Sequence, residues 1–153
     1  MRNVLKVLLI GVAFLIAAPA LVFAGESRAT AVNILGEAKV LKKGESDWKP
    51  LEKSAILTEG DSVRTAADSM VTLELVGNNK TAEVVVKPES EFSFQTFQHD
   101  ETKKEEHTQL NVDAGSVLVK AEKLVGDSKF EVKTPTSIVG IRGTVFEVQV
   151  SKS

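Results

Sequence analysis

The sequence contains no cysteine, only two histidines and a single tryptophan. Without cysteine the chain has no lipobox for acylation, no disulfide framework and no thiolate chemistry. The two histidines lie in one charged stretch, and no glycine-flanked serine elbow accompanies them, so a serine–histidine–aspartate set is not predicted. These absences argue against an enzyme. They favour a domain that its hydrophobic core alone holds together.

An excess of one charge sign is also lacking. The chain has 19 Lys and Arg against 21 Asp and Glu, which gives a formal net charge of −2, and most of these charges are interspersed. Binding to nucleic acid needs a basic footprint that this composition does not supply. We therefore expect no nucleic-acid partner.

One charged stretch, from Gln98 to Thr108, has neither apolar periodicity nor a turn signature, and it is predicted to be a solvated loop. It carries His99 and His107 beside several carboxylates, a ligand set that suits zinc or nickel in principle. A flexible loop does not fix ligands or the hydrogen bonds that orient them. We expect neither a metal site nor another cofactor.

The N-terminus is typical of an export signal. Arg2 and Lys6 precede an unbroken apolar run from Val7 to Ala24, which ends in small residues. We predict a signal peptide at residues 1–24, cut after Ala24, and a periplasmic or secreted protein. The alternative is an uncleaved inner-membrane anchor that faces the periplasm, since the run reaches the lower limit for spanning a bilayer. Membrane contact is expected only through this segment.

From residue 30 onward, apolar and polar residues alternate with period two, which indicates half-buried strands. No window of helical length shows an apolar stripe. Glycine and proline signals, including Ala114-Gly115, separate the runs. The pattern predicts an all-β fold of short strands in a twisted solenoid-like stack, with a β-sandwich as the alternative. The clearest alternating apolar positions are Val71, Leu73, Leu75, Val84, Val86, Phe92, Phe94, Val117, Val119, Phe130, Val132, Phe146, Val148 and Val150.

The large apolar side chains are predicted to be core, because a small domain needs most of them for burial. Trp48 is expected to cover the core, with sugar stacking as the alternative. Glutamates at alternating strand positions are expected to face solvent and not to form the paired carboxylates of a glycosidase. These glutamates are Glu74, Glu83, Glu91, Glu131 and Glu147.

A series of motifs resembles the FecR domain. In order they are GEAKV, WKPL, LTEGDSVRT, SMVTLEL, VKPESEFSF, LNVDAGSVLVKAE and KFEVKTPTSIVGIRGTVFEV. The resemblance covers about residues 34–150, after a short N-terminal lead at residues 25–33. Its most specific parts are GDSVRT and the stretch from Thr134 to Val148.

The resemblance implies an all-β extracytoplasmic domain that works by protein contact. In the best-known relatives the domain follows a membrane helix and a cytoplasmic segment that controls a sigma factor. Only six residues precede the apolar run here, so we expect a stand-alone exported form without that segment. The predicted function is a non-catalytic protein-binding or signal-sensing module of the bacterial envelope that binds another envelope protein, by surface contact or by strand addition at an open sheet edge. The alternative is a structural module associated with cell wall or polysaccharide.

The motif residues are expected to be structural. Asp61 is predicted to form an Asx turn with a backbone N–H two residues on, and Arg64 to reach carbonyls or a carboxylate on a neighbouring strand. The two glycines of GIRGT are predicted to need positive φ or a close backbone approach. Arg142 between them is expected to reach back to backbone or carboxylate acceptors, with an interface role as the alternative. The full set is Gly60, Asp61, Arg64, Thr65, Thr134, Pro135, Gly140, Arg142, Gly143, Thr144 and Phe146.

Overall fold

The computed structural model describes residues 28–76, 80–100, 102–124, 126–143 and 145–151. Within these ranges all regular structure is β-strand, so the prediction of an all-β fold is confirmed. No helix in the described part of the chain could cross a membrane. The predicted signal peptide, its cleavage site and Thr144 lie outside the described residues. The strands are β1 Arg28–Leu35, β2 Ala38–Leu41, β3 Lys49–Pro50, β4 Ile56–Leu57, β5 Ser62–Thr65, β6 Met70–Val76, β7 Lys80–Val86, β8 Glu91–Asp100, β9 Glu105–Ala121, β10 Lys129–Lys133, β11 Ile138–Ile141 and β12 Val145–Val150.

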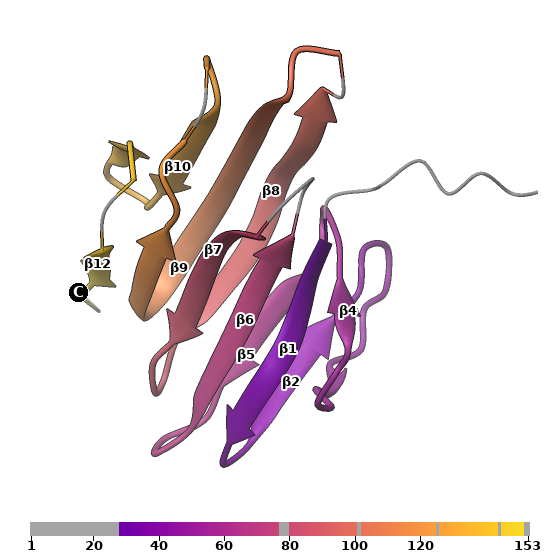
Figure 1. Ribbon diagram of the computed structural model, residues 1–153. Helices are drawn as coiled ribbons and strands as arrows, with labels where there is room; N and C mark the ends of the chain where they lie inside the picture. The colour runs from indigo at the N-terminus through magenta and orange to yellow at the C-terminus, as the bar shows by residue number, and fades with distance from the viewer. Residues whose placement is uncertain (1–27, 77–79, 101, 125, 144, 152–153) are drawn as a thin grey trace, which may run out of the picture.

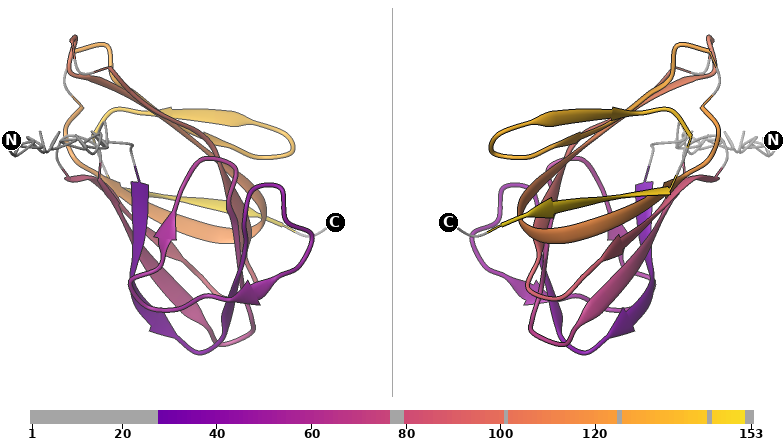
Figure 2. Two further views of the ribbon diagram at one scale, coloured as in Figure 1. Left: turned by 90° about the vertical axis from the view of Figure 1, so that its right-hand side faces the viewer. Right: turned by 90° about the vertical axis from the view of Figure 1, so that its left-hand side faces the viewer.

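The strands form one sheet that curls into an open half-barrel (Figures 1 and 2). The main path through the sheet is β3-β2-β5-β8-β9-β7-β6-β1-β4, and β10, β11 and β12 branch from it at β9. In Figure 1, β1, β6 and β7 lie in front of β2, β5 and β8, so the curled sheet has two facing layers. All described pairings are antiparallel apart from β9 with β10.

The longest strand, β9, links the two layers. Its first half pairs with β8 and β10, and its second half pairs with β7 and β12. The change of partners falls at Gly115, where φ is +83° and a Cβ atom would lie 2.5 Å from the Cα of Ser90. The hydroxyl of Ser90 accepts a 2.8 Å hydrogen bond from the Ser116 N–H. The turn predicted at Ala114-Gly115 is therefore wrong, because glycine lets one strand bend without ending.

The predicted alternation places the core between the layers. The strand residues Val71, Leu73 and Leu75 are fully buried, and Phe92 packs edge-to-face on Phe94 with ring centroids 5.2 Å apart. Most of the predicted alternating positions are buried, whereas Phe146 and Val150 on β12 are only partly buried against the core. The sequence pattern thus identified the inner face correctly and missed the exposure near the C-terminus.

Two predicted boundaries change. Residues 28–33 belong to β1, with Ala29 and Ala31 fully buried, so they are part of the domain and not a lead before it. The solvated loop predicted at Gln98–Thr108 is also wrong, because β8 runs to Asp100 and β9 starts at Glu105. Asp100 Oδ1 accepts from the N–H of Thr102 at 2.9 Å, which supports the turn. The sequence of this polar hairpin shows no apolar–polar alternation, because few of its side chains reach the core.

The two sides of the half-barrel end differently. On one side, β3 pairs with β2 and β4 pairs with β1, and the short segment between β3 and β4 joins the two layers. Leu51 of this segment and Leu57 of β4 are buried. On the other side lie β11 and β12, which pair only with β10 and β9 respectively among the described strands. β11 and β12 are therefore open edges on the C-terminal side, and β3 and β4 at the ends of the main path also have one strand partner each.

Candidate functional site

Asp61 of the GDSVRT motif is a buried anchor with 1% of its surface exposed. Its carboxylate accepts from the N–H groups of Thr58 and Lys43, both at 2.9 Å, and from Lys42 Nζ at 2.7 Å. Burial raises the pKa of Asp61, but the hydrogen bonds from Lys42, Thr58 and Lys43 outweigh it and hold the pKa below its ordinary value. The predicted Asx turn is wrong, because these donors precede Asp61 in the chain.

Gly60 and Thr65 are the first and last residues of the same motif, and both form hydrogen bonds with backbone groups. Gly60 has φ of +91°, and its N–H donates to the carbonyl of Phe94 at 2.8 Å. The Thr65 hydroxyl donates to the Lys87 carbonyl at 2.6 Å and accepts from the Ser90 N–H at 3.0 Å. Both residues therefore fix the position of β5 within the sheet.

Arg64 is engaged within the domain. It pairs across strands with Glu91, with Nη2 at 2.9 Å and Nε at 3.0 Å from the same carboxylate oxygen. Its Cζ lies 4.3 Å from the centre of the Trp48 ring, which is a cation–π distance. Trp48 is only half-buried. The guanidinium and the indole thus stabilise each other on the outside of the sheet.

The C-terminal motif begins with a tight turn between β10 and β11. The Thr134 N–H donates to the Ser137 carbonyl at 2.8 Å, and the Ser137 N–H donates to the Thr134 hydroxyl at 3.0 Å. Pro135 is exposed at the turn. Thr134 is buried, so this part of the motif shapes the hairpin.

The two glycines of GIRGT differ. Gly143 has φ of +65°, and a Cβ there would lie 2.9 Å from Lys123 Cα, so both features predicted for it are present. Gly140 lies in β11 without positive φ, and a Cβ there would meet nothing within 4 Å. The prediction for Gly140 is therefore wrong. Its hydrogen atom leaves open space on the outside of the hairpin.

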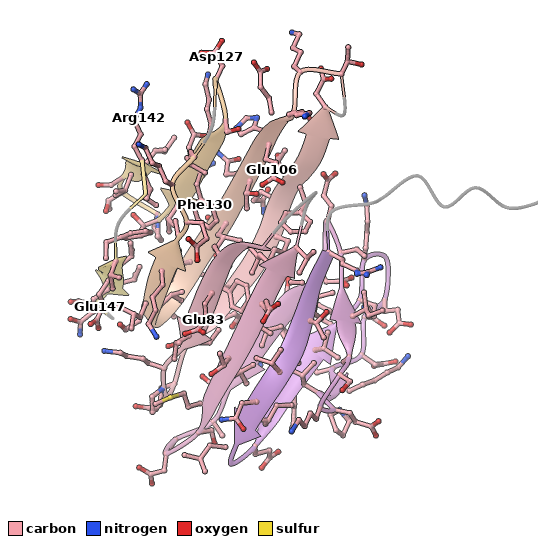
Figure 3. All side chains as sticks on the ribbon, viewed as in Figure 1. Glu83, Glu106, Asp127, Phe130, Arg142 and Glu147 are labelled. Atoms are coloured by element: carbon pink, nitrogen blue, oxygen red, sulfur yellow. The ribbon has the colours of Figure 1, made fainter. Side chains whose placement is uncertain are left out.

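Arg142 does not reach back to the domain. Its side chain is exposed, and it makes no hydrogen bond or ion pair with any described residue. Figure 3 shows it pointing away from the sheet, at the end of β11. The prediction that Arg142 satisfies carbonyls or a carboxylate is contradicted: the β10–β11 register is regular through Ile141, and the exposed guanidinium has no acceptor among the described residues. Its charge is available on the surface.

Sequence reasoning missed two apolar residues of β11. Ile138 is 61% exposed and Val139 40% exposed, although their partners on β10 form a regular ladder. An apolar pair in a strand is normally core, and only the position of β11 at the edge reveals the exposure. Val145 at the start of β12 is also exposed. The C-terminal motif thus builds an edge with exposed apolar side chains beside an unpaired arginine.

A shallow groove on the outside of the same hairpin extends from Gly126 to Glu131 and from Gly140 to Arg142. Its wall includes Glu131, whose carboxylate lies 3.2 Å from Gln109 Nε2 and 3.6 Å from His107 Nε2. Among the described residues no group of three or more His, Asp or Glu side chains is arranged to hold a metal. Phe130 and Ile141 also line the groove, so its surface is partly apolar.

Glu147 on β12 has a local structural role. Its carboxylate accepts from Lys87 Nζ at 2.7 Å and from the Ser116 hydroxyl. The hydrogen bonds from Lys87 and Ser116 hold the pKa of Glu147 below its ordinary value. Because Lys87 follows β7 and Ser116 belongs to β9, Glu147 ties β12 to the sheet from outside.

The comparison with protein families gives a match to a family described as FecR protein, over residues 61–153. Comparisons with curated proteins and with solved structures give no match. The FecR family is a regulatory, envelope-associated domain family that is not known for catalysis. The matched range starts at Asp61 and includes β5 to β12, hence all of GDSVRT except Gly60, the C-terminal motif and the C-terminal edge. Since it spans more than half of the chain, the protein belongs to the FecR family.

Proposed function

We propose that this protein is an exported, non-catalytic module that senses or transmits a signal in the bacterial envelope by binding another protein at its C-terminal sheet edge. Membership of a regulatory family supports the signalling role. The observation that carries the binding role is β11, which pairs only with β10 among the described strands and exposes Ile138 and Val139. Unpaired N–H and C=O groups beside exposed apolar side chains provide a template on which another chain can pair.

The export part of the proposal rests on the N-terminal sequence. Arg2 and Lys6 followed by the apolar run to Ala24 favour secretion, and a cut after Ala24 makes Gly25 the first residue of a periplasmic or secreted protein. The intact mass of the protein from the periplasmic fraction tests this directly. A full-length species that stays in the inner membrane would establish the anchored form instead.

Photo-crosslinking in living cells tests the binding role. A photoreactive amino acid replaces Ile138 on the open edge, and a matched control replaces Lys53, which is exposed on the segment that joins β3 to β4. We expect a discrete protein adduct from position 138 and none from position 53.

The same cells test the competing role. If position 138 gives no protein adduct while the protein sediments with isolated cell wall, a structural module of the wall replaces the signalling module. Sedimentation that survives washing in high salt would strengthen that result, because loose ionic adsorption is screened.

A further inference from the structure

The free edge of β11 offers an incomplete apolar row on its inner face. Leu110 of β9, Val132 of β10 and Val139 of β11 are in register across the sheet. Leu110 and Val132 are fully buried, whereas Val139 is 40% exposed. The exposure rises because no described strand lies beyond Val139. A strand added at this edge would continue the row with an apolar side chain of its own, and side chains two residues apart share that face.

The outer face of the same hairpin carries basic side chains around Ile138, which lies opposite Lys133. Lys129, Lys133 and Arg142 are exposed there, at the two ends of the β10–β11 pair. The single carboxylate between them, Glu131, already contacts Gln109 and His107. Gly140 lies opposite Glu131 and leaves open space. Asp127 lines the groove beside Lys129 and Arg142. Although the whole chain has a formal net charge of −2, the three basic residues outnumber Glu131 and Asp127 here, so this face is net positive.

We infer that the β11 edge receives an extended segment of a partner protein, with apolar residues at alternate positions and carboxylates between them. The apolar residues would cover Val139 and the neighbouring inner face, and the carboxylates would lie on the outer face, near Arg142 and Lys133. Backbone hydrogen bonds to the free edge supply affinity, and the alternating side chains supply selectivity. This inference rests on the proposed function, since it specifies the chemistry of the protein that binds.

Charge argues for such a segment over a second copy of this chain. Antiparallel pairing of β11 with its own copy would bring two basic outer faces together, with Arg142 and Lys133 of both copies on one surface. Gathering like charges on one surface opposes such pairing. An acidic, alternating segment has no such conflict and neutralises the exposed arginine.

A designed peptide tests the inference with the purified protein from residue 25 onward. The probe alternates valine and glutamate, has blocked ends and carries a fluorescent label, and the control peptide has lysine in place of glutamate. Binding is measured by fluorescence anisotropy at low and at high salt. We expect saturable binding of the glutamate peptide, weakened by salt, and weaker binding of the lysine peptide.

Protein variants locate the contact. Arg142→Glu should lower the affinity for the glutamate peptide about fivefold or more, the effect of losing one exposed charge pair. Lys53→Glu is the same charge change on the opposite side, and it should leave this affinity unchanged. Ile138→Pro should reduce binding of both peptides, because proline removes a backbone donor at the edge. Melting curves show that each variant is folded.

Four outcomes would overturn the inference. Equal binding of both peptides would show that the edge does not prefer carboxylates. Unchanged affinity of the Arg142→Glu variant would show that the peptide binds at another place. A concentration-dependent dimer by light scattering, abolished by Ile138→Pro, would make a second copy the occupant. If the peptide fails to bind while position 138 still crosslinks a protein in cells, the extended-segment inference fails and the proposed binding function stands.

Discussion

Lys42 and Asp61 form an ion pair in which Nζ lies 2.7 Å from the carboxylate, whose side chain is 2% exposed, whereas the lysine side chain is 38% exposed. The same ammonium group donates to the Ile56 carbonyl at 2.6 Å. Lys42 follows β2, Ile56 lies in β4 and Asp61 precedes β5. Through these contacts, Lys42 connects the segment around β4, on one side of the half-barrel, to β2 and β5. The GDSVRT motif thus has a structural purpose far from the open edge.

Asp61→Ala should lower the free energy of unfolding by about 3 kcal/mol, because the N–H groups of Thr58 and Lys43 lose their acceptor. Urea denaturation of the variant and the parent measures the change. Asp47→Ala is the matched control, since Asp47 is exposed, and its midpoint should not move. An unchanged midpoint for Asp61→Ala would show that water satisfies these groups equally well.

Stability should fall in acid, and Asp61 should account for part of the fall. The pKa of Asp61 is lowered in the folded protein, so its contribution is present above the unfolded value of about 4 and is lost as pH falls through the folded value. Urea midpoints between neutral pH and about pH 3 test this. Asp61→Asn, which has no charge to lose, should show a shallower decline, and an identical decline would exclude Asp61 as a source.

Gly115→Ala should destabilise the domain by about 3 kcal/mol or more, since it combines an unfavourable φ with contacts to Ser90 and Glu89. Gly44 provides the control, because its φ of +80° is similar and a Cβ there meets nothing within 4 Å. Gly44→Ala should therefore cost only about 1 kcal/mol. Equal losses in thermal or urea unfolding would mean that the bend in β9 tolerates a side chain.

The two glycines of GIRGT should respond in opposite ways. Gly143→Ala should cost about 1–3 kcal/mol, because its φ is positive and the Lys123 backbone is close. Gly140→Ala should leave stability unchanged or raise it by about 0.5 kcal/mol, since a strand glycine is replaced without a clash. Differential scanning calorimetry of both variants distinguishes the roles. A large loss at Gly140 would contradict the open space found there.

The two arginines of the motifs should also differ. Arg142→Ala should change the free energy of unfolding by no more than about 0.5 kcal/mol, as for other exposed, unpaired residues. Arg64→Ala should cost about 1 kcal/mol, because it loses Glu91 and the Trp48 ring. Urea unfolding of both variants provides the comparison. A larger loss at Arg142 than at Arg64 would reverse this assignment.

Local pattern was enough to identify the strands and most of the inner face. Val71, Leu73 and Leu75 alternate with polar residues, and they are buried because successive strand side chains point to opposite sides. Local pattern failed where a strand is polar or bends. The hairpin after Gln98 has few core-facing residues, and β9 passes through Gly115 without ending, so neither feature leaves a sequence signal that differs from a loop or a turn.

What the sequence determined by itself is the all-β class, the core positions and, through the ordered motifs, the FecR resemblance, because these depend on residue type and near-neighbour spacing. Only the tertiary structure decided which strands lie at an edge. The sequence predicts that Arg142 reaches acceptors within the domain and makes no prediction for Ile138 and Val139 beside it, yet all three are exposed. Exposure depends on whether a further strand lies beyond β11, and that is a property of long-range pairing, which no local spacing records.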